Sequence, residues 1–268
     1  MTSTVYTGNG WEIHEGRWQD SAPESVDVVI SDPPYDERTH KGGRKGIRRA
    51  SPDGGSKEIC ARAPIGFDPV CPVDVGPLLL TLARRWVVLF CSAEQLGGYR
   101  DACGDNYIRG GIYVKTNPTP QFTGDRPGQW GDGIAILHRK GRKRWNRGGH
   151  AAIWSAARGQ VSERVHETQK PIGLMLQLVS DFSDSGELVW DPYCGSGTTG
   201  IACMRLGRRF LGHEMQPHYA EIAAERLTAE ERGLTLQDVW RGQMGILDTI
   251  ENDPIAPSDW LATLTETP

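Results

Sequence analysis

Three glycines in the last third of the chain have the spacing of a nucleotide-cofactor loop. Gly195, Gly197 and Gly200 form the pattern Gly-x-Gly-x-x-Gly, and Glu214 stands nineteen residues after the first of them. Glycines let the backbone approach a ligand closely, and a carboxylate beyond the next strand accepts hydrogen bonds from two ribose hydroxyls. No lysine follows the last glycine, which disfavours a phosphate-binding P-loop. The pattern predicts a site for an adenosine cofactor, and NAD, FAD and S-adenosylmethionine all fit it.

A second turn, Asp32-Pro33-Pro34-Tyr35, combines a carboxylate, a carbonyl fixed by a proline pair and an aromatic ring. Such a cup suits a planar base that bears an amino group. If the Asp32 carboxylate and the Pro33 carbonyl each accept one hydrogen of that NH₂, the nitrogen lone pair leaves its conjugation with the ring. It is then able to attack a methyl sulfonium in line. Tyr35 would stack on the base, which has to leave the duplex to reach the turn.

Both turns are expected at the carboxyl ends of buried strands. Residues 26–31 form a β-branched run that two prolines stop, and residues 187–190 lead into the glycine loop. Further strands are predicted over 86–91, 111–115, 133–138 and 209–213, and helices over 75–85, 93–103, 171–182, from the glycine loop to Leu206, and over 216–232. The alternation predicts an α/β fold, with 111–115 and 133–138 as a hairpin-like pair at a sheet edge. Open α/β sheets bind ligands at the carboxyl ends of their strands, so we expect the two turns to meet.

Length and composition narrow the class of protein. The 268 residues are 38% hydrophobic and 24% charged, with a mean hydropathy of −0.47, which is ordinary for a globular protein. The longest apolar run, residues 86–91, is far shorter than the roughly 20 residues of a membrane-spanning helix. The N-terminus lacks the pattern of a secretion signal, so a cytoplasmic location is expected. Six cysteines include no Cys-x-x-Cys pair and are read as reduced and structural, with no metal site.

The net charge of −4 hides an uneven distribution. Residues 1–35 carry −5, residues 36–170 carry +10 and residues 171–268 carry −9. Residues 36–66 lack a hydrophobic period and are expected to form a long loop, and residues 139–147 hold six basic side chains around Trp145, which we expect to anchor in the core. A basic centre between acidic flanks predicts a face for a polyanion.

The motifs together resemble the β-type amino DNA methyltransferases, which modify adenine N6 or cytosine N4. In that type the Asp-Pro-Pro-Tyr turn precedes the glycine loop, as here at 32 and 195. The segment His166-Glu167-Thr168-Gln169-Lys170-Pro171 is similar to the family's His-Pro-Thr-Gln-Lys-Pro, and Gly212-His213-Glu214 and Tyr219 continue the likeness. Three positions depart from the family: Glu167 replaces a proline, Tyr193 a phenylalanine, and Arg17 the aspartate of a Gly-Asp pair that approaches the cofactor adenine in many relatives.

The resemblance implies a Rossmann-like fold with a seven-stranded, mainly parallel sheet, one antiparallel strand and helices on both faces. It implies S-adenosylmethionine as cofactor and a target-amine pocket made by Asp32, Pro33, Pro34 and Tyr35. The implied cofactor residues are His166, Thr168, Gln169, Lys170, Asp191, Pro192, Tyr193, Cys194, Gly195, Ser196, Gly197, Thr198, Thr199 and Glu214. Glu214 would bind the ribose, and Thr168 and Lys170 would lie near the methionine carboxylate. No covalent cysteine is required, so Cys194 is read as a small loop residue.

The expected partners are DNA and S-adenosylmethionine, with no membrane and with a homodimer left open. We expect one methyltransferase domain over residues 1–268, with DNA-contacting loops at about 36–66 and 138–165 and a C-terminal extension at about 233–268. The candidate phosphate contacts, flanking the flipped nucleotide, are Arg44, Lys45, Arg48, Arg49, Arg142, Lys143 and Arg144. No sizeable recognition domain fits before His166, so sequence selection rests on short loops or a partner subunit, or is loose.

Adenine N6 is favoured over cytosine N4 as the methylated atom, because family members that act on cytosine more often begin the first turn with serine. A non-catalytic nucleic-acid-binding relative stays open because of Arg17. A nicotinamide oxidoreductase is disfavoured, since the glycine pattern falls at residue 195 and leaves room for only one clear strand after it. An RNA methyltransferase stays open too, because nothing in the chain reads a 2′-hydroxyl.

Overall fold

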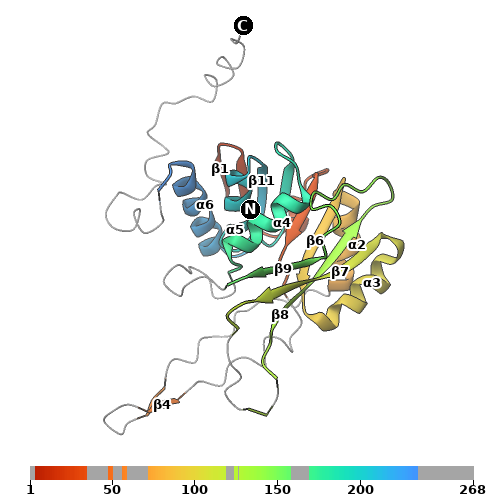
Figure 1. The fold of residues 1–268 in the computed structure, drawn as a ribbon. Coiled ribbons are helices and arrows are strands. Elements are labelled where there is room, and N and C mark those ends of the chain that lie inside the picture. The colour runs from red at the N-terminus through yellow and green to blue at the C-terminus, as the bar shows by residue number, and fades with distance from the viewer. Residues whose placement is uncertain are drawn as a thin grey trace.

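A nine-stranded sheet, in the order β1-β2-β11-β10-β3-β6-β8-β7-β9, is the centre of the computed structural model (Figure 1). The structure describes residues 4–34, 48–50, 56–58, 72–118, 124–125, 127–157 and 169–234. The strands of this sheet are β1 (Val5–Gly8), β2 (Trp11–Glu15), β3 (Val28–Ser31), β6 (Trp86–Cys91), β7 (Tyr107–Lys115), β8 (Gly131–His138), β9 (Ile153–Ala156), β10 (Leu188–Asp191) and β11 (Arg209–Glu214).

Neighbouring strands from β2 to β6 run parallel, whereas β8 is antiparallel to both β6 and β7. The seven strands from β2 to β7 thus form the predicted mainly parallel sheet with one antiparallel strand. The sequence did not indicate three strands of this sheet, β1, β2 and β9. β1 pairs antiparallel with β2 at one edge, and β9 pairs parallel with β7 at the other. All three are short and partly exposed, so they lack the continuous apolar pattern that marks a buried strand.

Helices cover both faces of the sheet. The helices are α2 (Pro72–Leu82), α3 (Leu96–Cys103), α4 (Ile172–Phe182), α5 (Thr198–Arg205) and α6 (Pro217–Glu231), with 3₁₀ turns at Trp18–Asp20, Ala93–Gln95 and Gly104–Asn106. One core cluster joins α4, α5 and α6 to side chains such as Val88 and Phe90, and the other joins α2 and α3 to Val87 and Leu89 (Figure 1). Alternate residues of β6 enter opposite clusters because successive side chains of a strand point to opposite faces.

Most predicted elements appear within a few residues of their expected bounds, and the strand over 86–91 has the bounds of β6. The helix expected over 93–103 begins instead as a 3₁₀ turn, with Ser92 and Gln95 as a capping box, before α3. Trp145 is partly buried and packs against the core, as expected. Within the loop expected over 36–66, β4 (Arg48–Ala50) pairs antiparallel with β5 (Ser56–Glu58), so that segment is not wholly irregular.

Residues 235–268, which hold most of the predicted C-terminal extension, lie outside the described residues. Among the helices that the structure describes, none has the length and apolar character needed to cross a membrane.

Candidate active site

The two turns meet because their strands are parallel neighbours. β3 and β10 pair in register, with Val28 opposite Val189 and Val29 opposite Trp190. Directly past this pairing, the Ser31 hydroxyl donates to Asp191 Oδ1 at 2.5 Å, which joins the residue before Asp32 to the first residue of the glycine loop. The expectation that the turns lie at one edge of the sheet is confirmed by this contact.

The buried side chain of Asp191 holds the glycine loop in place through hydrogen bonds. Its side chain accepts hydrogen bonds from Thr199 Oγ1 at 2.5 Å and from the backbone N–H of Tyr193 at 3.1 Å, in addition to Ser31. The residue is 3% exposed, and burial raises its pKa to about 6 although these three donors oppose the shift. Its carboxylate is therefore occupied by the protein's own groups, and it shapes the loop on which the cofactor residues stand.

Two physical reasons, a left-handed backbone and close packing, favour glycine in this loop. Gly197 has φ +76°, a left-handed conformation that glycine adopts without strain, and it precedes the first residue of α5. A Cβ on Gly200 would come within 2.7 Å of the Phe210 ring, so this glycine is required for the close packing of α5 on β11. The first position, Gly195, has φ +51° and open space where a Cβ would stand.

Glu214, the last residue of β11, lies against this loop. Its Oε2 accepts the backbone N–H of Gly195 at 3.0 Å, and its Oε1 accepts that of Gln216 at 2.8 Å. The residue is 7% exposed, and burial raises the pKa of its carboxyl above the usual value. The backbone N–H of Gly16 donates to the Glu214 carbonyl at 2.8 Å, so the departing pair Gly16-Arg17 does lie beside the acid implied to bind the ribose.

Asp32 pairs with Lys170, which the resemblance had placed near the cofactor. Lys170 Nζ donates to Asp32 Oδ2 at 2.6 Å and lies 4.7 Å from the centre of the Phe90 ring. Asp32 Oδ1 is buried and has no hydrogen-bond partner among the described residues. Pro33 is buried and Pro34 partly buried, whereas Tyr35 lies outside the described residues. The target-amine turn thus holds one carboxylate oxygen that is already used and one that is available.

Two further charged residues complete this end of the sheet, and sequence reasoning missed both. Asp132, at the start of β8, is 5% exposed; its Oδ1 accepts from Lys115 Nζ at 2.9 Å, and its Oδ2 lies 3.7 Å from Lys170 Nζ. Burial alone would lower the pKa of Lys170, but Asp32 and Asp132 hold it above its usual value. Because β8 is antiparallel, its first residues lie beside the last residues of β6. An acid just before a predicted apolar strand was the available signal.

Arg226 of α6 also belongs to the site and was missed. Its Nη1 donates to the Ser196 carbonyl, to Ser196 Oγ at 2.9 Å and to Thr198 Oγ1 at 3.3 Å. Burial lowers the pKa of its guanidinium to about 10. A cavity of about 340 Å³ lies next to it, and its lining includes Gln169, Lys170, Arg205 and Arg226. The cationic lining fits an anionic group of a ligand.

The remaining predicted cofactor residues fall into two sets. Pro192, Tyr193, Cys194, Ser196 and Thr198 lie on the loop, and Gln169 Oε1 accepts from Ser196 Oγ at 3.5 Å. Burial holds the pKa of the Cys194 thiol well above its usual value, so it is a neutral loop residue as expected. His166 and Thr168 lie outside the described residues, and no cluster of three or more potential metal ligands is found in the part of the chain that the structure describes.

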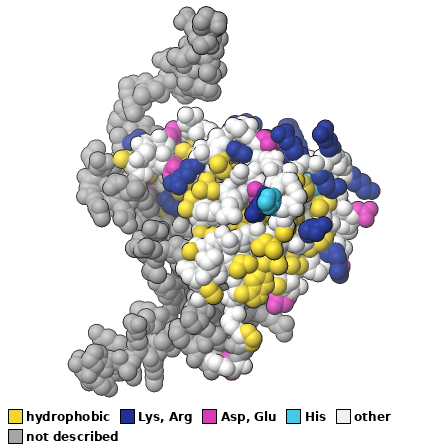
Figure 2. Space-filling model, viewed as in Figure 1, with side chains coloured by type: hydrophobic (Ala, Val, Ile, Leu, Met, Phe, Trp, Pro, Cys, Tyr) yellow, Lys and Arg dark blue, Asp and Glu magenta, His cyan; other side chains and the backbone are white. Residues whose placement is uncertain are grey.

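The basic loop after β8 lies at the other end of the strands. Trp86, which begins β6, pairs with His138, which ends β8, so residues 139–150 follow from the amino-terminal edge of the parallel strands. Arg142, Lys143 and Arg144 are exposed there, and Figure 2 shows lysine and arginine side chains gathered at the upper right, where Figure 1 places this loop. Asp32 stands at the opposite edge of the sheet, so these side chains and the target-amine turn lie at different ends of the strands. Arg44 and Lys45 lie outside the described residues, and Arg48 and Arg49 open β4.

The fold is similar to that of solved structures, among them one titled as a complex with SAM and one titled as a DNA methyltransferase. The structure titled M1.HpyAVI-SAM complex matches with a TM-score of 0.60 and 21% identity over 81% of this chain and 98% of that one. PvuII DNA methyltransferase (cytosine-N4-specific) matches with a TM-score of 0.59 and 15% identity over 91% and 94%. These likenesses concern the fold alone.

Residues 112–225 match the family model N6_N4_Mtase, described as DNA methylase, and the resemblance to the amino DNA methyltransferases is thereby confirmed. Type II methyltransferase M.HinfI of Haemophilus influenzae is 25% identical over 233 residues, and type II methyltransferase M2.DpnII of Streptococcus pneumoniae is 45% identical over 84 residues. These alignments cover 76% and 29% of this chain, and 63% and 30% of the two relatives.

Proposed function

We propose that this chain transfers a methyl group from S-adenosylmethionine to the exocyclic N6 of an adenine flipped out of DNA. The observation that carries the proposal is the Ser31–Asp191 hydrogen bond, which brings the amine-accepting turn and the cofactor loop together at the carboxyl ends of two neighbouring strands. The family match and the S-adenosylmethionine complex of a fold relative support the same chemistry. We further propose that residues 1–268 act as one methyltransferase domain.

The residues around the glycine loop fit the proposed cofactor. Open space at the Cβ position of Gly195 leaves the loop backbone accessible, and Glu214 is held beside it with its carboxylate partly engaged by two backbone N–H groups. The cavity lined by Lys170 and Arg226 supplies cations of the kind that a methionine carboxylate requires. When bound, S-adenosylmethionine supplies an electrophilic methyl group on a sulfonium.

Asp32 provides the second requirement, an acceptor for the target amine. Its Oδ1 is buried without a partner among the described residues, and such an oxygen favours an incoming N–H donor because an unsatisfied acceptor costs about 1–3 kcal/mol. We propose that Oδ1 and the Pro33 carbonyl each accept one hydrogen of the amine. The carboxylate would then stabilise the positive charge that grows on nitrogen as the bond to the methyl carbon forms and the carbon–sulfur bond of the sulfonium breaks, and the nitrogen would afterwards release one proton to solvent.

Adenine N6 is proposed over cytosine N4 because the turn begins with aspartate. The fold does not separate the two bases, since a cytosine-N4 enzyme is among the structures of this fold. DNA phosphates near the target nucleotide are proposed to contact Arg44, Lys45, Arg48 and Arg49, which follow Tyr35 within fourteen residues of chain. Arg142, Lys143 and Arg144 would contact only duplex that extends to the opposite edge of the sheet.

The test is incubation of the protein with S-adenosylmethionine carrying a deuterated methyl group and with mixed-sequence DNA, followed by digestion to nucleosides and mass analysis. We expect deuterated N6-methyladenine. N4-methylcytosine as the sole product would overturn the choice of base. Absence of any labelled nucleoside, together with no calorimetric binding of S-adenosylmethionine at millimolar concentration, would favour instead a non-catalytic nucleic-acid-binding relative, the alternative that Arg17 beside Glu214 keeps in view.

A further inference from the structure

Four charged side chains form an alternating row at the carboxyl end of the sheet. In spatial order they are Asp32 after β3, Lys170 before α4, Asp132 at the start of β8 and Lys115 at the end of β7. Consecutive members are 2.6, 3.7 and 2.9 Å apart between nitrogen and oxygen. Only the first member was expected at the target-amine site, and nothing in the motifs assigned a role to Asp132 or Lys115.

The four charged side chains of this row are largely buried. The side chains of Lys170 and Asp132 are 14% and 6% exposed, and those of Lys115 and Asp32 are 20% and 26% exposed. Buried charges need partners, and removal of one partner leaves an uncompensated charge. Lys170 faces two carboxylates at different distances, so the charge on Asp132 governs how strongly the ammonium neutralises Asp32.

We propose that Asp132 is a positioning residue for methyl transfer, which holds the Lys170 ammonium between itself and Asp32 and thereby keeps Asp32 Oδ1 available to the target amine. The inference rests on the proposed function, because it assigns Asp32 to the amine. Lys115 in turn pairs with Asp132. Without Asp132, Asp32 is the carboxylate that remains beside Lys170 among the described residues, and the ammonium would offset the negative charge that stabilises the developing cation on nitrogen.

The charged groups around Lys170 determine whether each substitution raises or lowers the pKa of Lys170. Asp32 and Asp132 raise its pKa, Tyr113 contributes in the same direction, and the Cys91 thiol is neutral because burial raises its pKa to about 12. Asp132→Asn removes a negative neighbour, so it lowers the pKa of Lys170. Lys115→Met removes the positive neighbour of Asp132 while keeping the side-chain stem, so it leaves the pKa of Lys170 unchanged or higher.

The experiment measures Lys170 itself and catalysis in parallel. Competitive acetylation with acetic anhydride between pH 7 and 10, read by peptide mass spectrometry against exposed Lys140, gives the reactivity and pKa of Lys170 in the unliganded protein. Methyl transfer kinetics give kcat and KM for DNA. Asp27→Asn is the matched control: this aspartate precedes β3 at its opposite end, is 20% exposed and lies 3.6 Å from Arg84.

For Asp132→Asn we expect Lys170 to react at least about threefold faster at pH 8 and kcat to fall about 10- to 100-fold, with KM for DNA nearly unchanged. Asp132→Glu should recover part of the loss in kcat. Lys115→Met should not accelerate the labelling of Lys170, and Asp27→Asn should leave both readouts at the wild-type level.

Equal labelling and equal kcat in the wild type and Asp132→Asn would overturn the proposal. Faster labelling in Lys115→Met as well would also overturn it, because loosened packing exposes Lys170 regardless of the sign of the charge removed. If Asp132→Asn does not fold, the labelling of Lys115→Met and the pKa of Lys170 in the wild-type protein still test the proposal. A pKa of Lys170 below that of Lys140 would contradict a lysine held between two carboxylates. Should the wild type transfer no methyl group at all, the proposed function fails while the labelling result stands separately.

Discussion

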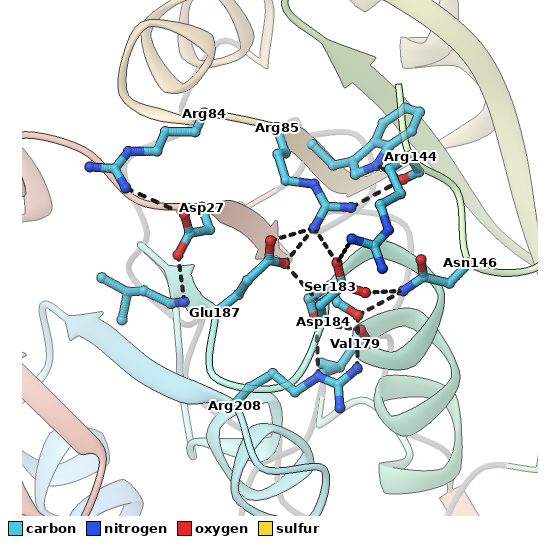
Figure 3. A network of polar contacts seen from close by, with 12 residues as sticks. Asp27, Arg84, Arg85, Arg144, Asn146, Val179, Ser183, Asp184, Glu187 and Arg208 are labelled. Atoms are coloured by element: carbon cyan, nitrogen blue, oxygen red, sulfur yellow. Dashed lines mark hydrogen bonds and ion pairs between the residues drawn. The ribbon is translucent and has the colours of Figure 1, made fainter. Parts of the chain in front are cut away.

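The two ends of the central strands both carry ionic networks, but one network is closed and the other is open. At the amino-terminal end, Arg85 donates to both Glu187 oxygens at 2.5 Å, to Asp184 at 3.1 Å and to the Arg144 carbonyl at 3.2 Å (Figure 3). Asn146 and Arg208 fill the carbonyl and hydroxyl oxygens of Ser183 in the same network. At the carboxyl end, Asp32 keeps a buried oxygen that has no partner among the described residues.

The comparison shows that ionic networks can either hold loops together or leave an acceptor for a ligand. A network whose acceptors are all filled holds loops together and has no capacity for a ligand. A network with an unfilled acceptor is less favourable for the free protein, and the missing hydrogen bond becomes available to a donor that arrives with the substrate. The predictions below separate the two networks by what each loses when it is broken.

The largest effect is expected at the open end. Asp32→Ala removes the acceptor of the target amine, and we expect turnover to fall by at least about 1,000-fold. Binding of S-adenosylmethionine, measured by calorimetry, should be nearly unchanged because the glycine loop and Glu214 are untouched. Undiminished turnover in this variant would contradict the proposed mechanism.

Breaking the closed network should cost stability and leave chemistry alone. Glu187→Gln removes the charge that faces the largely buried Arg85, and we expect the free energy of unfolding, from urea denaturation, to fall by about 1–3 kcal/mol with kcat preserved below the melting temperature. Glu230→Gln is the comparison, because its partner Arg205 is 46% exposed and such pairs contribute about 0–1 kcal/mol. A loss of kcat in Glu187→Gln at full folding would contradict the separation of the two networks.

Asp191 should make stability depend on pH in a direction that marks a buried carboxylate. Its pKa is about 6 in the folded protein and near 4 in the unfolded chain, so the folded state binds the extra proton more tightly. The stability that this group contributes is therefore present below pH 4 and is lost as pH rises through 6. Relative to Asp191→Asn, which lacks this titration, the wild type should gain about 2–3 kcal/mol of unfolding free energy between pH 7 and pH 4 in urea titrations. A constant difference across that range would show that the carboxylate is not perturbed.

The smallest effect is expected from the exposed basic loop. Replacing Arg142, Lys143 and Arg144 together by glutamine should leave kcat within about twofold and change the slope of log K against log salt by less than about 0.9, the value of one phosphate contact. The matched variant replaces Arg44, Lys45, Arg48 and Arg49 by glutamine. It should reduce the magnitude of the salt slope by at least the value of about two phosphate contacts. The reverse ranking would place the DNA at the amino-terminal edge of the sheet.

The sequence by itself determined the parts of the protein that depend on local pattern. Alternating strand and helix patterns gave the α/β class, the carboxyl-end placement of both turns and the hairpin of β7 and β8, because apolar periodicity reports which face of an element is buried. The glycine spacing and Glu214 were visible for the same reason: backbone conformation at Gly197 and close packing at Gly200 restrict the residue type at fixed positions in the chain.

Only the tertiary structure decided which charges meet. Asp132 and Lys115 join Asp32 because β8 runs antiparallel beside β6, so the first residues of β8 lie at the end where the parallel strands finish. The same reversal carries Arg142, Lys143 and Arg144 to the far edge of the sheet, a placement that their basic composition does not indicate. Charge composition is read along the chain, whereas an electrostatic site is set by distances of a few ångströms between residues that can lie far apart in sequence, as Asp32 and Lys170 do at a separation of 138 residues.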